Sequence, residues 1–221
     1  MAYTHVSVGN VGQLTVDLII TTLNLKKVAS IWHPAIIPFI GGDPYQVEVD
    51  NPCTACELYT SEALKIAVIQ LRSSIEPRLA LDFFALLRTD ILNLNISEIV
   101  ILTTVFAYEL HNIESSHFCY ISNSDTKLKK LHISPIVVNE FGKYVANGAG
   151  FAIKLYELLH DVVKCSVLAK YVSEGDNRPD AFAMMNLIKE LYLLEGKNSF
   201  PIKIPLSWNY VFGNPPPVGL F

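Results

Sequence analysis

The N-terminal stretch, residues 6–23, constrains the fold more than any other part of the sequence. Residues 6–8 are typical of the end of a buried strand, Gly9 and Gly12 allow a sharp turn or a close backbone approach, and Asn10 can cap a following helix. Apolar residues then recur at three- and four-residue steps from Val11 onward, as in a packed helix. A strand, a glycine turn and a helix in this order predict an α/β domain.

The rest of the chain continues this alternation of strand and helix patterns. Helices are predicted at 77–91 (with Pro77 in the first turn), 125–132, 151–160 and 180–194. Strands are predicted at 27–32, 57–60, 64–71, 99–102, 118–121 and 165–172, with an irregular proline-rich loop at 33–46. The run at 99–102 is entirely apolar, as expected of a strand covered on both faces. We therefore predict a three-layer α/β/α sandwich as a single domain over 1–213, followed by a flexible, proline-rich docking tail at 214–221.

Composition restricts the classes of partner. Hydrophobic residues make up 51% of the chain and charged residues 17%, against about 25% charged in typical soluble domains. With so little charge to cover its surface, the protein is expected to hold a large permanent protein partner. A net charge of −4 and the absence of a basic run argue against nucleic acid. No signal peptide or membrane span is recognised in the sequence, which predicts an intracellular protein.

The glycine turn is also the first candidate for chemistry. Backbone N–H groups at a helix N-terminus can cradle a phosphate between Gly9 and Gly12. However, the third glycine of the dinucleotide fingerprint is missing, as is the Lys-Ser/Thr pair of a P-loop. The residue pattern favours a packed corner, and a ligand site remains the alternative.

Three further groups have the residue types of a reactive site. Cys53 and Cys56 have CxxC spacing, but a second pair is missing, so they are interpreted as incidental. His160 followed by Asp161 is interpreted as a helix end rather than a catalytic dyad. The acidic residues of 174–180 are interpreted as a capped turn, with Asp176 or Asn177 as the cap and Pro179 in the first turn of the helix.

The C-terminus offers a different kind of site. Three consecutive prolines, 215–217, favour a stiff polyproline II segment that carries Val218, Gly219, Leu220 and Phe221 with a free carboxylate. A stiff stalk with an apolar tip and a terminal anion suits insertion into a pocket with a cation at its base. The alternative is that this tail folds back on its own domain.

Several blocks together resemble the proteasome assembly chaperone 2 family. They lie at 6–14, 17–20, 172–177, 179–181, 204–208 and 212–213, and the chain ends in Pro-Pro-x-x-Leu-Phe. The resemblance implies an α/β/α fold related to nucleoside phosphorylases, with neither enzyme activity nor a cofactor or metal. It also implies a heterodimer with the type 1 proteasome assembly chaperone that binds the α subunits of the 20S proteasome, promotes α-ring assembly and hinders wrong associations, in the cytoplasm and also the nucleus.

The same resemblance assigns the tail. Related proteins insert a C-terminal hydrophobic–tyrosine–any sequence between α subunits, and the matching positions here are Gly219, Leu220 and Phe221. Leucine at the tyrosine position lacks the phenolic hydroxyl, which leaves apolar docking as the expected contact. The alternative function from another class is a phosphorylase-like enzyme that binds a nucleoside or phosphate at the turn between Gly9 and Gly12.

Overall fold

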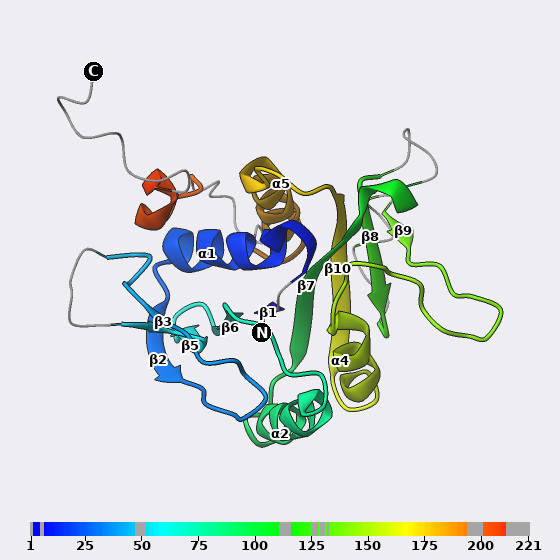
Figure 1. Cartoon of the computed structure of the whole chain (residues 1–221), viewed down its shortest axis with the longest axis horizontal. Helices are drawn as coiled ribbons and strands as arrows, with labels where there is room; N and C mark the ends of the chain where they lie inside the picture. Colours follow the sequence, from blue (N-terminus) through cyan, green and yellow to red (C-terminus); the bar gives the residue numbers. More distant parts are fainter. Residues whose placement is uncertain are drawn as a thin grey trace.

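The protein, a computed structural model, is built on one large mixed sheet with helices on both faces (Figure 1). The structure describes residues 2–4, 7–46, 52–110, 116–124, 128, 131, 133–193 and 201–210. Within these residues the sheet has eight strands, in the spatial order β2 (Lys26–Ser30), β5 (Cys56–Ser61), β6 (Ile66–Leu71), β1 (Ala2–Thr4), β7 (Glu98–Phe106), β10 (Lys164–Val172), β8 (Phe118–Ser122) and β9 (Ser134–Pro135). A separate two-stranded ribbon pairs β3 (Ile40–Gly41) with β4 (Cys53–Thr54).

The centre of the sheet is parallel. β6, β1, β7 and β10 run in the same direction, whereas β5 and β8 run antiparallel to their inner neighbours. Side chains of β7 alternate between two cores: Ile99 and Ile101 pack on one face of the sheet, Val100 and Leu102 on the other. This two-sided burial explains why the strand reads as a continuous apolar run.

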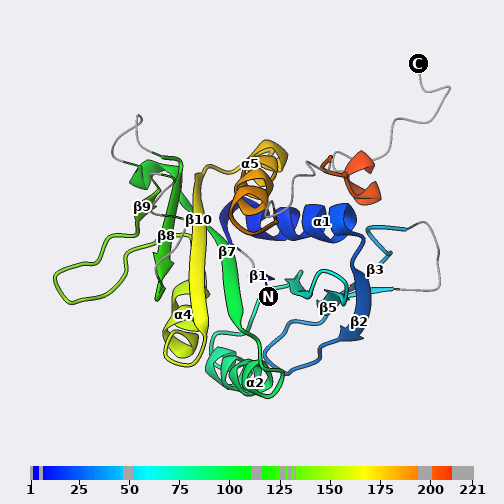
Figure 2. The same ribbon diagram turned by 180° about the vertical axis from the view of Figure 1, so that it is seen from behind.

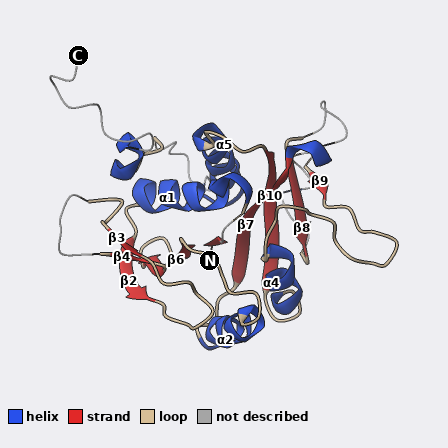
Figure 3. Cartoon of the chain, in the orientation of Figure 1, coloured by secondary structure: helices blue, strands red, loops and turns tan. Residues whose placement is uncertain are grey.

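The helices form the outer layers, as Figure 3 and the reverse view in Figure 2 show. α1 (Val11–Leu23) and α5 (Arg178–Ile188) cover one face, and α2 (Ala80–Asn93) and α4 (Ala152–Leu159) cover the other. A π-helical turn, Lys189–Leu193, continues α5. The three-layer α/β/α prediction is confirmed.

Several predicted boundaries were wrong, each for a local reason. β7 extends to nine residues because buried threonines continue it beyond its apolar run, and β10 begins one residue before its predicted start, at Lys164. The 64–71 strand starts at Ile66, since Lys65 takes a left-handed φ of 54° in the turn after β5. α2 begins at Ala80, so Pro77 precedes the helix. The loop at 33–46 contains the short strand β3, and β9 had not been predicted. Most of the predicted 125–132 helix lies outside the described residues.

Candidate functional site

The N-terminal corner joins β1 to α1 through a short 3-10 turn, Val8–Asn10. Gly9 has a φ of +65°, a left-handed conformation that favours glycine, and a Cβ built on it would lie 2.2 Å from Nδ2 of Asn177. The Val8 carbonyl accepts a hydrogen bond from Thr104 Oγ1 at 2.8 Å, and the Val8 N–H donates to the Gly148 carbonyl at 3.4 Å. Thr104, Gly148 and Asn177, which are far from this turn in the sequence, therefore all contact it.

This geometry supports the packed-corner interpretation over the anion cradle. The side chain of Asn177 occupies the space in front of Gly9, and Gly12 is buried within α1. The predicted cap by Asn10 was wrong, because Asn10 takes a left-handed φ of 53° and its side chain makes no cap hydrogen bond. The glycine at position 9 allows a close contact between the 3-10 turn that precedes α1 and Asn177, the N-cap residue of α5.

The cysteines are buried and free. Burial raises the pKa of Cys53 to about 11 and that of Cys56 to about 12, so both thiols are protonated near neutral pH and poor nucleophiles. Cys53 lies on β4 and its Sγ is 3.5 Å from Oε2 of Glu57. The described residues contain no group of three or more His, Cys, Asp or Glu side chains arranged to hold a metal ion.

The other two candidates have structural partners. Asp161 forms an exposed ion pair with Arg88 at 3.0 Å, and Nδ1 of His160 lies 3.0 Å from the Glu157 carbonyl, so the two side chains serve different contacts. In the acidic loop, Asn177 holds the N-cap position of α5, but its side chain makes no cap bond. Asp176, one residue earlier, accepts a hydrogen bond from the N–H of Arg178, the first residue of the helix, at 3.2 Å. Asp180 pairs with Lys170 across 2.9 Å.

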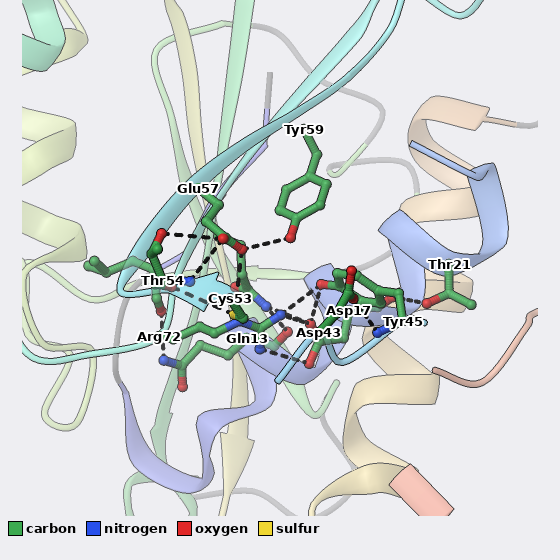
Figure 4. Close-up of polar contacts among 12 residues, drawn as sticks. Gln13, Asp17, Thr21, Asp43, Tyr45, Cys53, Thr54, Glu57, Tyr59 and Arg72 are labelled. Carbon is green, nitrogen blue, oxygen red and sulfur yellow. Dashed lines mark hydrogen bonds and ion pairs between the residues drawn. The ribbon is translucent and has the colours of Figure 1, made fainter. Parts of the chain in front are cut away.

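A buried polar cluster lies between α1 and the sheet, and Figure 4 shows how its side chains converge. Asp17 Oδ1 accepts hydrogen bonds from Arg72 Nη2 at 2.8 Å, from the Tyr45 hydroxyl at 2.6 Å and from Gln70 Nε2 at 2.8 Å. The Tyr45 hydroxyl also accepts from Arg72 Nη2 at 2.8 Å. Gln13 joins the cluster by donating to the Leu71 carbonyl at 2.7 Å. Helix α1 is thereby tied to the end of β6.

The titration of this cluster follows from burial and charge. Burial, with the neighbouring Asp17 carboxylate as the next contribution, raises the pKa of Tyr45 well above its usual range. Burial by itself would lower the pKa of Arg72, but Asp17 and Tyr45 raise it above its usual range. Arg72 and Asp17 thus form an ion pair with a neutral tyrosine between them, an arrangement that fixes structure and offers no proton near neutral pH.

A second buried acid, Glu57 on β5, has partners on β2, β4 and β5. Its carboxylate accepts hydrogen bonds from the Thr54 N–H at 2.9 Å and the Tyr59 hydroxyl at 2.7 Å, and pairs with Lys27 Nζ at 2.5 Å. Burial raises the pKa of Glu57, but the bonds from Lys27, Tyr59 and Thr54 outweigh burial and hold that pKa below its usual range. Glu57 is therefore ionised and fully paired.

Exposed apolar residues lie on α2, where Leu81 is 60% exposed, and on two further segments that each carry a highly exposed aromatic ring. One is the 28–40 stretch, where Trp32 is 81% exposed; its exposed apolar residues are Val28, Trp32, Ile37, Phe39 and Ile40. The other is a hairpin-like projection at residues 137–145, here called the finger, where Phe141 is 77% exposed. The finger adjoins a cavity of about 640 Å³ at the ends of β7 and β10, lined by residues that include Val105, Tyr108, Cys119, Ile136, Val145 and Tyr171.

The C-terminal part of the described chain is anchored to the body. The Lys203 N–H donates to Thr22 Oγ1 at 3.0 Å, and the Ser207 N–H donates to the Pro44 carbonyl at 3.0 Å. Trp208, in the 3-10 helix η4 (Leu206–Tyr210), is buried and meets the Phe182 ring edge-on at 5.9 Å. The predicted tail site, Val218, Gly219, Leu220 and Phe221, lies outside the described residues.

The sequence analysis missed the buried cluster and the finger. Gln13 and Asp17 lie four residues apart on α1, which resembles a solvent-facing polar stripe, yet both are buried. The finger had a local signal, since Asn139 and Gly142 bracket a turn of the kind that closes hairpins. None of the described helices has the length and apolar character needed to cross a bilayer.

Comparisons with known proteins agree along nearly the whole chain. The model of the PAC2 family matches residues 5–192. Proteins named Proteasome assembly chaperone 2 from Xenopus laevis and Homo sapiens are 32% and 30% identical to this chain, in both cases over 98% of it and 92% of the relative.

Two solved structures share the fold at low sequence identity. A Thermoplasma acidophilum protein described as having unknown function aligns with a TM-score of 0.68 at 21% identity, covering 90% of this chain and 77% of that one. Pyrococcus furiosus PbaA, described as an archaeal homolog of proteasome-assembly chaperone, aligns with a TM-score of 0.68 at 13% identity, covering 90% and 83%. The sequence blocks, the α/β/α layers and these matches agree: this chain belongs to the PAC2 family.

Proposed function

We propose that this chain is a non-catalytic proteasome assembly chaperone. In this proposal it forms a heterodimer with the type 1 proteasome assembly chaperone, binds α subunits of the 20S proteasome, promotes α-ring assembly and hinders wrong associations, in the cytoplasm and the nucleus. The observation that carries the proposal is the similarity over 98% of the chain to proteins named Proteasome assembly chaperone 2.

The geometry of the domain supports a binding role rather than catalysis. The turn that could hold a phosphate is occupied by Asn177, the CxxC thiols are buried and protonated, and the buried acids Asp17 and Glu57 are paired. Meanwhile, large apolar side chains are exposed on the 28–40 segment and the finger. Exposed apolar surface of this kind is typical of proteins that bind other proteins.

Within this proposal, Val218, Gly219, Leu220 and Phe221 form the docking tail. Leu220 and Phe221 supply two apolar side chains, each worth about 1.5–3 kcal/mol when fully buried. Deleting residues 215–221 is therefore expected to weaken binding to α subunits about 100-fold or more, while the fold and the heterodimer persist.

The test is co-purification followed by affinity measurement. The full chain is expected to recover the type 1 chaperone and 20S α subunits, and recovery of neither would contradict the proposed function. The deletion variant is then compared with Leu220→Tyr, which places a phenol at the family's tyrosine position and is expected to strengthen α-subunit binding. Unchanged affinity in the deletion variant would remove the tail from the mechanism.

A further inference from the structure

We propose that the finger, residues 137–145, is the part of this chain that contacts the second chaperone subunit, with the Phe141 ring inserted into an apolar pocket of that subunit. This inference rests on the proposed heterodimer. The finger follows β9 and projects from one end of the molecule (Figure 1). Its tip is the turn from Asn139 to Gly142, and Phe141 lies on that turn, 77% exposed.

The turn is held rigidly by hydrogen bonds. The Gly142 N–H donates to the Asn139 carbonyl at 3.0 Å, and the Asn139 N–H donates to the Lys143 carbonyl at 2.9 Å. The Asn139 side-chain oxygen accepts from the N–H groups of Phe141 and Lys143, at 3.0 and 2.9 Å. Gly142 has a φ of 73°, the left-handed position that such a hairpin turn requires. The Phe141 backbone is therefore ordered before binding, which lowers the entropic cost of contact.

The base of the finger is fixed to the body. Ile136 is buried and its N–H donates to the Tyr120 carbonyl on β8 at 2.8 Å. The Tyr144 ring meets the Tyr156 ring of α4 edge-on at 5.9 Å, and the Val145 N–H donates to the Val137 carbonyl at 2.9 Å. The finger therefore presents Phe141 in a defined direction relative to the sheet.

The sides of the finger below its tip are apolar. Val137, Val138 and Val145 are exposed there, and Val137 and Val145 line the 640 Å³ cavity. Tyr108, which lines this cavity, is 72% exposed and stacks on Phe106 with 5.1 Å between ring centroids. A rigid aromatic side chain surrounded by apolar neighbours has the composition of an interface hot spot.

The sheet edge beside the finger favours a folded partner over an extended peptide. β9 has two residues, Ser134 and Pro135, and proline lacks the N–H that an added strand would need. A partner must therefore bind the finger through side chains, which calls for a preformed apolar pocket. The acid Glu140 and the base Lys143 lie on either side of Phe141 in the sequence, so the rim of that pocket should carry the opposite charges.

The position of the finger distinguishes the second chaperone from the proteasome ring. η4, from which the C-terminal residues continue, lies at the opposite end of the long axis in both views (Figures 1 and 2). Lys203, before η4, bonds to Thr22, and Ser207 within η4 bonds to Pro44. The finger contacts α4 through Tyr144, and Ile136 at its base bonds to β8. If the tail engages α subunits, the finger end remains available for a different protein, which is the second chaperone in the proposed heterodimer.

The experiment measures affinity for the purified type 1 proteasome assembly chaperone with the full chain and three variants. Phe141→Ser is expected to weaken the heterodimer about 30-fold or more, the scale of a hot-spot aromatic. Asn139→Ala keeps the ring but removes two hydrogen bonds of the turn, and should weaken the heterodimer by a smaller factor. Trp32→Ser removes an equally exposed aromatic from another segment and should change affinity less than about twofold.

Binding of each variant to 20S α subunits is measured in parallel and is expected to stay unchanged. An unchanged heterodimer with Phe141→Ser would overturn the inference, as would an effect confined to α-subunit binding or to self-association. If the wild-type chain did not bind the type 1 chaperone, both the proposed heterodimer and this inference would be wrong. If the wild-type chain binds but Phe141→Ser binds equally well, only this inference is wrong.

Discussion

The polar cluster and the finger place charge and apolar surface in opposite ways. Between α1 and β6, the Asp17 carboxylate is buried and pairs with Arg72, whose side chain is 16% exposed, and Tyr45 and Gln70 donate further hydrogen bonds to Asp17. The finger instead exposes Phe141 and three valines. Burying charge and exposing apolar surface both cost free energy in an isolated domain.

The difference between the cluster and the finger separates structural from binding features. The buried Asp17 carboxylate accepts hydrogen bonds from Arg72, Tyr45 and Gln70 within the chain, which offset the cost of burying it and tie α1 to β6. The apolar side chains of the finger have no such compensation in the described residues, and burial against another protein would supply it. If this comparison is correct, substitutions in the cluster should change stability and substitutions in the finger should change binding.

The largest effect on stability is expected from Arg72→Met. This substitution leaves the Asp17 carboxylate buried without its cation, and breaking a buried ion pair from one side costs about 3–5 kcal/mol. The free energy of unfolding, measured by urea denaturation, should fall by that amount. Arg88→Met is the matched control: it removes the exposed pair with Asp161 and should cost less than about 1 kcal/mol. Equal losses in the two variants would break the comparison.

An intermediate, pH-dependent effect is expected from Glu57→Gln. The pKa of Glu57 is lowered in the folded protein, so its contribution to stability is present above the unfolded value of about 4.3 and is lost as the pH falls through the folded value. At pH 7, wild type should exceed the variant by about 1.5–3 kcal/mol, because hydrogen bonds to an ionised group are lost.

That stability difference should shrink as the pH falls below about 4, and urea denaturation across a pH series measures it. Glu62→Gln, at an exposed position in the turn after β5, is the matched control and should change the free energy of unfolding at pH 7 by no more than about 0.5 kcal/mol. A Glu57→Gln difference that stayed constant with pH would argue that the carboxylate contributes through shape rather than charge.

The smallest effect on stability is expected from Phe141→Ser, the variant that should matter most for the heterodimer. The ring is mostly exposed and the turn is held by backbone and Asn139 hydrogen bonds, so the free energy of unfolding should change by no more than about 0.5 kcal/mol. Thermal denaturation measures it. A larger loss of unfolding free energy would mean that Phe141 packs against its own chain. The finger would then be a structural feature like the polar cluster.

The sequence predicted the helices and strands whose apolar residue pattern matches the face that is buried in the folded protein. Residues 99–102 indicated a strand buried on both faces, and the 3.6-residue spacing located α1, α2, α4 and α5 to within a few residues. The buried continuation of β7 was missed because Thr103 and Thr104 are polar; their hydroxyls are satisfied by the carbonyls of Ala149 and Val8. Such partners lie far away in sequence and leave no local signal.

The polar cluster and the finger also depend on contacts that are distant in the sequence. Asp17 can be buried because Arg72 and Gln70, more than 50 residues away, donate hydrogen bonds to its carboxylate. The turn at Asn139 and Gly142 was recognisable in the sequence, but the exposure of Phe141 depends on how β9 and α4 position the finger. The assignments of Val218, Gly219, Leu220 and Phe221, and the domain boundary at 213, remain predictions.

The anchoring of Trp208 limits how far residues 218–221 can reach. Phe221 lies thirteen residues after Trp208, and a fully extended chain covers at most about 3.5 Å per residue, so Phe221 stays within about 45 Å of that anchor. Any pocket that receives Leu220 and Phe221 must fall inside this radius, which restricts how the domain can be oriented on its target. A tether of this length also keeps the end at a high local concentration near the pocket, so a weak terminal contact can be occupied most of the time once the domain is bound.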